Sequence, residues 1–178
     1  MIKKLKANSA PGPDGITPRL LQELVEEVAT PLSHIFTKSM AEGAVPEDWR
    51  IANVTPIFKK GKKARTGNYR PFSLTSVPGK IMEHVIKESL QSHLTRNSLI
   101  RKTQHGFMQN KSCTTNLLEF LETDTRLVDE GKSLDIICLD FAKAFDLVPC
   151  LRLIKKLKAH GVGGRLLKWI SAWLSDRN

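Results

Sequence analysis

Apolar residues recur every three or four positions along most of this chain, as they do on one face of an amphipathic helix. The first such run follows Thr17, a candidate N-cap, and Pro18, a residue type favoured in the first helical turn. Thr30-Pro31 repeats this pair, so we expect a second helix to begin there and to end at Gly43. Further helices are predicted around residues 81–90, from Ser112 to Gly131, up to His160-Gly161, and around residues 166–174.

Shorter stretches predict strands and turns. Residues 9–18 contain three prolines and two glycines and predict a structured loop. Residues 50–57 and 69–76 have the composition of strands, and the Lys- and Gly-containing segment between them predicts a hairpin, with Pro71 at an edge or irregular position. Residues 134–140 are almost continuously apolar, as in a strand covered on both faces. The pattern therefore favours an α+β fold in which helices outnumber strands.

Composition adds an expectation about partners. The 178 residues include 28 Lys and Arg against 18 Asp and Glu, for a net charge of +10, which favours an anionic partner, with nucleic acid the first candidate. No apolar run reaches the ~18 residues of a membrane span, so no membrane partner is expected. The cysteines (Cys113, Cys138 and Cys150) lack zinc-site spacing and are odd in number, so reduced thiols and an intracellular location are expected.

A cluster of basic residues occupies the predicted hairpin. Residues 50–70 contain seven Lys or Arg and no acid. A flexible, positively charged turn of this kind suits the phosphates of a nucleic-acid backbone or of a nucleoside triphosphate. A solvated turn without a partner remains the alternative, because Lys and Arg are common in turns. Five of the seven lie in the turn itself: Lys59, Lys60, Lys62, Lys63 and Arg65.

Asp140 ends the apolar segment 134–140 and is a candidate metal ligand. A carboxylate at this position can bind a hard cation such as Mg²⁺, and two-metal phosphoryl transfer needs at least two such groups. The alternative is a solvent-exposed acid at a strand end, which is also the expectation for Asp124 and Asp135. Asp146 is expected to cap or orient the next helix.

Four segments in order resemble the reverse transcriptase domain of non-LTR (LINE-type, jockey-like) retrotransposons, and together they cover essentially the whole chain. They are SAPGPDGITPRLL, GAVPEDWRIANVTPIFKKGKKARTGNYRPFSLTSVPGKIMEHVI, QHGFMQNKSCTTNLLEF and LDFAKAFDLVPC. The resemblance implies an α+β, helix-rich part of a right-hand polymerase, with mainly fingers over about 1–111. The first part of the palm, with an incomplete sheet, would occupy about 112–178. The implied activity is RNA-directed DNA polymerisation by two-metal nucleotidyl transfer.

The resemblance also implies roles for residues in the last segment. Asp140 matches the first catalytic aspartate, which binds both Mg²⁺ ions. Phe141 matches the residue whose backbone carbonyl reaches a metal. Phe145 matches the aromatic residue beneath the incoming sugar, where it blocks a 2′-hydroxyl and favours deoxynucleotides.

The hairpin residues acquire roles in the same way. Lys59 or Lys60, together with Arg70, match the fingers residues that hold the triphosphate, in keeping with the planar fork of Arg and the mobile charge of Lys. The implied partners are an RNA template, a DNA primer and deoxynucleoside triphosphates. Three more cations would lie near the template strand: Lys62, Lys63 and Arg65.

The second palm motif of this family carries two adjacent aspartates, and the sequence contains no Asp-Asp pair. The resemblance therefore implies a truncated fragment without the rest of the palm and the thumb, and we expect these 178 residues alone not to polymerise. Two alternatives are a non-catalytic remnant that still binds nucleic acid and a relic without a selected function. The family implies a nuclear or cytoplasmic location.

Overall fold

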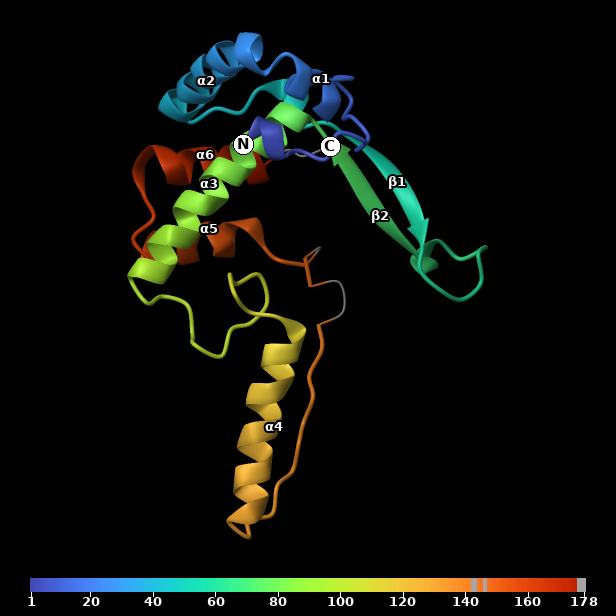
Figure 1. Ribbon diagram of the computed structural model, residues 1–178, viewed down its shortest axis with the longest axis vertical. Helices are drawn as coiled ribbons and strands as arrows, with labels where there is room; N and C mark the ends of the chain where they lie inside the picture. The colour runs from blue at the N-terminus through green and yellow to red at the C-terminus, as the bar shows by residue number, and fades with distance from the viewer. Residues whose placement is uncertain (142–143, 146, 176–178) are drawn as a thin grey trace. The chain divides into compact units, whose positions relative to one another are not determined.

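The computed structural model describes residues 1–141, 144–145 and 147–175. The chain divides into two compact units, one of Met1–Gln91 with Pro149–Asn178 and one of Ser92–Val148. Each is described by itself, and Figure 1 shows the elements of both.

The first unit begins with two consecutive helices, α1 (Pro18–Glu23) and α2 (Val25–Glu42). The Thr17 hydroxyl accepts a hydrogen bond from the Leu20 amide at 3.1 Å, which confirms the predicted cap. Gly43 has φ 61°, and its amide donates to the Met40 and Ser39 carbonyls, which confirms the predicted helix end.

The predicted helix start at Thr30-Pro31 is wrong. Pro31 lies inside α2, and the break between the helices falls at Leu24 instead, with φ −101° and ψ 27°. Proline removes one helical hydrogen bond. Val28 and Leu32, on either side of it, both pack against the same buried cluster, and this packing holds the helix together across the missing bond.

A two-stranded antiparallel hairpin follows, formed by β1 (Ala52–Phe58) and β2 (Tyr69–Thr75) as predicted. The register runs from Ala52 opposite Thr75 to Phe58 opposite Tyr69 and places Pro56 directly opposite Pro71. In a two-stranded sheet each strand is an edge, so prolines without an N–H group are tolerated there.

The core of the first unit lies between helices distant in sequence, α2, α3 (Val77–Arg96), α5 (Cys150–Ala159) and α6 (Gly164–Leu174). Trp169 is 1% exposed and stacks on Trp173 with ring centroids 5.1 Å apart. Its indole N–H donates to the Ser39 hydroxyl at 2.8 Å, and that hydroxyl donates to the Ala44 carbonyl. The other buried residues of this core include Val45, Trp49, Met82, Ile86, Val162 and Ile170.

The second unit contains α4 (Cys113–Asp129). Ser112 caps it as predicted: its hydroxyl accepts from the Thr115 amide at 3.2 Å, and the Thr115 hydroxyl accepts from the Ser112 amide at 2.9 Å. Figure 1 shows the chain running back along this helix in an extended form.

The strand predicted at residues 134–140 is not formed. This segment has no strand assignment, and its side chains are exposed, with Ile137 at 82% and Leu139 at 89%. A strand needs a partner edge for its backbone hydrogen bonds. Among the described residues the only paired strands are β1 and β2, which pair with each other.

The described residues therefore combine helices with one small antiparallel sheet, in agreement with the predicted α+β class. The three cysteines of the chain are free and exposed. No helix in the described part of the chain is long and apolar enough to cross a membrane. The division into fingers and palm near residue 111 stays a prediction.

The predicted loop at 9–18 packs tightly against the junction of β2 and α3. The Asp14 carboxylate accepts from the Ile16 amide at 3.2 Å and tightens the turn. Gly12 is buried, and a Cβ added to it would lie 2.6 Å from the Ser76 nitrogen and from the Thr75 carbonyl carbon and oxygen. Only glycine fits this approach, because both surfaces are backbone.

Gly12→Ala is therefore expected to lower the free energy of unfolding by about 1–3 kcal/mol, the usual cost of overpacking. Urea denaturation monitored by tryptophan fluorescence measures this change. Gly67→Ala is the matched control, because a Cβ there meets nothing within 4 Å. Equal midpoints for the two variants would show that the loop does not depend on this close approach.

Ser39→Ala is expected to lower the free energy of unfolding by about 1–3 kcal/mol, because it leaves the Trp169 N–H and the Ala44 carbonyl without their partner. The same denaturation assay measures it. Ser33→Ala, at an exposed position of the same helix, should change the value by less than ~0.5 kcal/mol. A Ser39 variant as stable as the Ser33 variant would contradict the importance of this buried bond.

Candidate functional site

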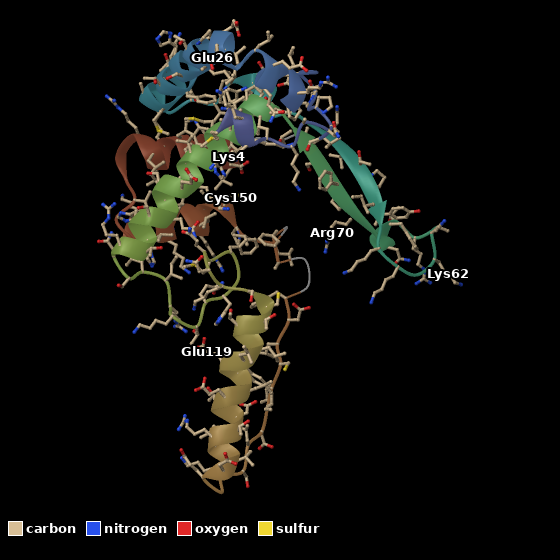
Figure 2. The ribbon with its side chains drawn as sticks, in the orientation of Figure 1. Lys4, Glu26, Lys62, Arg70, Glu119 and Cys150 are labelled. Carbon is tan, nitrogen blue, oxygen red and sulfur yellow. The ribbon has the colours of Figure 1, made fainter. Side chains whose placement is uncertain are left out.

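The loop that closes the hairpin, residues 59–68, is called here the basic loop. It follows β1 directly and carries the five cations predicted to meet phosphates. All five are exposed, and none of them pairs with a carboxylate of the described residues. Figure 2 labels Lys62 in this loop and Arg70 on β2. The positive charge is therefore available to an external anion.

Hydrogen bonds from its own residues hold the basic loop in shape. The Lys59 amide donates to the Asn68 carbonyl at 2.8 Å. The Asn68 side-chain amide donates to the Lys62 carbonyl at 2.8 Å, and the Tyr69 hydroxyl donates to the Lys63 carbonyl at 2.9 Å. The loop is thus ordered before any ligand binds, which lowers the entropy cost of binding.

Aromatic side chains support the base of the loop. The Phe58 and Tyr69 rings meet edge to face with centroids 5.5 Å apart, and the Lys63 ammonium lies 5.9 Å from the Phe58 ring centroid. Arg70 is exposed and pairs with Ile57 in the register, one position from this aromatic pair. Arg70 and Lys59 therefore lie at the same end of the hairpin.

The other predicted residues lie in the second unit. Asp140 is exposed, and so are Phe141, at 83%, and Phe145, at 81%. A carboxylate and an adjacent backbone carbonyl are both hard oxygen donors of the kind that Mg²⁺ prefers. The described residues form no group of three or more His, Cys, Asp and Glu side chains able to hold a metal. Asp146, the expected helix cap, lies outside the described residues.

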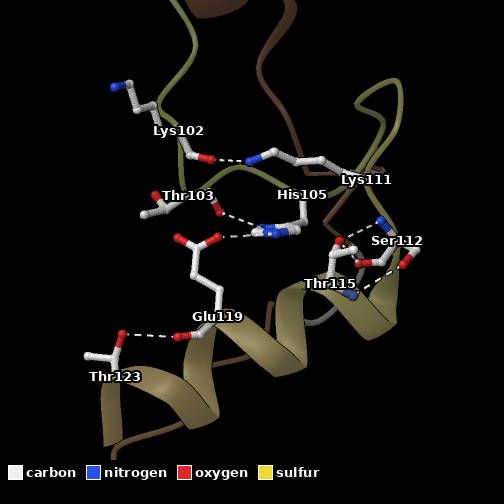
Figure 3. A network of polar contacts seen from close by, with 8 residues as sticks. All are labelled: Lys102, Thr103, His105, Lys111, Ser112, Thr115, Glu119 and Thr123. Carbon is white, nitrogen blue, oxygen red and sulfur yellow. Dashed lines mark hydrogen bonds and ion pairs between the residues drawn. The ribbon is translucent and has the colours of Figure 1, made fainter. Parts of the chain in front are cut away.

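A polar brace that the sequence did not reveal fixes the turn before α4 (Figure 3). The His105 side chain is 8% exposed, and its Nε2 lies 3.3 Å from the Glu119 carboxylate. Its Nδ1 lies 3.1 Å from the Thr103 carbonyl, which can only accept. Through its two ring nitrogens, His105 joins residues 103–105 to the helix.

Phe107, two residues after His105, meets Phe145. Their rings pack edge to face, with centroids 6.0 Å apart and an angle of 89° between planes. Sequence reasoning assigned a role to Phe145 but missed Phe107, because nothing in the periodicity of residues 104–112 indicates a contact almost 40 positions away. The predicted residues thus fall into two groups by their place in the chain, one on the hairpin and one in the second unit.

Comparison with known proteins identifies the family. The sequence profile described as "Reverse transcriptase (RNA-dependent DNA polymerase)" matches residues 57–178, from the end of β1 onward. This chain belongs to the reverse transcriptase family. The match includes both groups of predicted residues, and the resemblance seen in the sequence is confirmed.

Individual relatives come from non-LTR elements. The chain is 30% identical over 159 residues to the RNA-directed DNA polymerase from mobile element jockey of Drosophila melanogaster, covering 89% of the chain. It is 27% identical over 158 residues, 88% of the chain, to the probable RNA-directed DNA polymerase from transposon BS of the same organism. It spans 17% of the length of each of these two relatives.

Asn68→Ala is expected to speed trypsin cleavage after Lys62 and Lys63 by about fivefold, because a lost hydrogen bond of roughly 1 kcal/mol raises the population of open loop by that factor. Timed digestion followed by mass spectrometry of the first peptides measures this rate. Thr66→Ala is the control, since no hydrogen bond of the Thr66 side chain to another described residue is found. Identical rates in both variants would mean that Asn68 does not order the loop.

Proposed function

We propose that this chain forms the nucleotide- and template-binding part of an RNA-directed DNA polymerase, with the hairpin in the fingers and Asp140 in the palm. The observation that carries the proposal is the basic loop of a chain in the reverse transcriptase family: it presents five exposed cations that form no ion pair with the described residues, on a preordered hairpin. In the solvated-turn alternative, the same exposed charges would contact water alone.

In this proposed function, different residues of the hairpin bind two ligands, the incoming triphosphate and the template strand. Lys59 or Lys60, with Arg70, holds the incoming triphosphate, since they lie at the same end of the hairpin. The guanidinium of Arg70 can bind two phosphate oxygens at once. The cations of the central loop contact the template backbone without reading its sequence. They are Lys62, Lys63 and Arg65.

Asp140 and the Phe141 carbonyl would hold Mg²⁺ in the second unit, and their oxygen donors suit that ion. When bound, Mg²⁺ would offset the charge of the triphosphate and favour attack by the 3′-hydroxyl of the primer. The carboxylate of Asp140 is exposed and without an ion-pair partner in the described part of the chain, so it is free to bind a cation. The Phe145 ring would lie beneath the sugar and exclude a 2′-hydroxyl.

Two triple variants test the hairpin's part. Lys62/Lys63/Arg65→Ala should weaken binding of a fluorescent RNA–DNA primer–template, because phosphate contacts are lost. The slope of log affinity against log salt should fall by roughly 0.7 to 0.9 for each lost contact. Lys59/Lys60/Arg70→Ala should instead weaken binding of a deoxynucleoside triphosphate in the presence of Mg²⁺. Fluorescence anisotropy across a salt series measures the first, and calorimetric titration the second.

Lys3/Lys4/Lys6→Ala is the matched control, because it removes the same charge from exposed positions in or just after the N-terminal 3-10 helix η1 (Ile2–Lys4). It should change both affinities little. An equal loss of affinity in the control would show that the effect comes from net charge alone, and it would contradict a binding site on the hairpin. Primer–template binding without triphosphate binding would favour a nucleic-acid-binding remnant over a polymerase.

A further inference from the structure

The contact between Phe107 and Phe145 has a consequence for sugar discrimination. A ring that excludes a 2′-hydroxyl by its bulk must be held within about half an ångström, because a ring free to turn gives way to the larger sugar. Phe145 is 81% exposed, so little of the protein surrounds it. Its discrimination therefore depends on whatever contact fixes the ring.

Phe107 supplies such a contact. The edge-to-face arrangement, with centroids 6.0 Å apart and planes at 89°, is the geometry that aromatic pairs prefer. Phe107 is itself 80% exposed. A large apolar ring so open to water is not placed there by burial in a core.

The backbone at Phe107 is held in an unfavourable conformation. Its φ is +62°, in the left-handed region that bulky residues rarely adopt. Such strain persists only where surrounding contacts impose it. Here the Gln104 side chain donates to the Gly106 carbonyl at 3.1 Å, the Met108 amide donates to the His105 carbonyl at 3.3 Å, and His105 is tied to Glu119.

We propose that Phe107 is a positioning residue for Phe145: the braced turn at residues 103–108 presents its ring edge-on, and this sets how strongly the site prefers a deoxyribose over a ribose. The inference rests on the proposed function, because it needs Phe145 beneath the sugar. Phe107 acts on selectivity through Phe145 and touches neither the triphosphate nor the metal. The ligand class concerned is the sugar of a nucleoside triphosphate.

Two substitutions separate the ring of Phe107 from its backbone. Phe107→Asn removes the ring but keeps a residue that tolerates the left-handed conformation. Phe107→Tyr keeps the ring and should restore the contact. Phe120→Asn is the matched control, because it removes a partly exposed ring from α4 in the same unit.

The first measurement follows the ring of Phe145 by ¹⁹F NMR of the full chain with 4-fluorophenylalanine, the Phe145 signal being assigned with Phe145→Leu. Phe107→Asn should shift and sharpen that signal, while Phe107→Tyr and Phe120→Asn should leave it close to its original position. An unchanged Phe145 signal in Phe107→Asn would overturn the inference, whatever the nucleotide data show.

The second measurement is the ratio of the Kd for a ribonucleoside triphosphate to that for the matching deoxynucleoside triphosphate, with Mg²⁺ present. Phe107→Asn should lower this ratio by about tenfold, the low end of what one small group in a steric pocket contributes. Its deoxynucleotide Kd should stay nearly constant. Phe107→Tyr should restore the ratio, which a merely structural role would not do. A ratio unchanged in Phe107→Asn would contradict the inference.

The two readouts separate this inference from the function on which it rests. If the wild-type chain binds no triphosphate, or binds the ribonucleoside and deoxynucleoside triphosphates equally, the proposed role of Phe145 is contradicted. The proposed effect of Phe107 on sugar selectivity is then contradicted as well. The NMR signal then still decides whether Phe107 holds the ring. If the wild type discriminates and Phe107→Asn discriminates equally, the function stands and Phe107 has no part in it.

Discussion

The buried indole of Trp169 is the contact on which the first unit depends. It joins α6 to Ser39 of α2, residues 130 positions apart in sequence, and stacks on Trp173. Gly79, in the first turn of α3, packs against this group so closely that an added Cβ would lie 3.2 Å from the Trp49 ring. Because α3 follows β2 after a single residue, the fully buried Ser76, the tryptophan cluster also fixes the base of the hairpin. The placement of the basic loop thus follows from packing at the other end of the strands.

Local signals in the sequence predicted those elements that short-range interactions define. The caps at Thr17 and Ser112 and the end at Gly43 each depend on residues within a few positions of one another, and the hairpin pairs two strands that are neighbours in the sequence. The helix start predicted at Thr30-Pro31 was wrong because tertiary packing decided that position: Val28 and Leu32 pack on one buried cluster, and this packing overrides the local signal. Neither the brace at His105 nor the Phe107–Phe145 pair could be predicted, because each joins residues distant in sequence.

Residues 134–140 show how much a strand depends on its partner. Their composition is that of a covered strand, yet the segment is extended, exposed and unpaired in the described part of the chain. An apolar segment with open backbone groups is a template for pairing with another strand, whether in a larger sheet or in an aggregate. Composition specified the tendency of this segment, whereas a strand also requires a partner, and the paired strands of the described residues, β1 and β2, pair with each other.

The two groups of site residues place different demands on the protein. Phosphate recognition tolerates small displacements, because charges act over several ångströms and Lys side chains can adjust their reach. A basic loop ordered by hydrogen bonds among its own residues and Tyr69 is sufficient for that task. Steric selection between two sugars tolerates far less, because the distinction is a single hydroxyl group. A ring given that task at an exposed position needs support from a rigid neighbour. In the proposed site, the strained turn at Phe107, held by the contact of His105 with Glu119, provides such support. Residues 134–139, which precede Asp140, form no helix or strand.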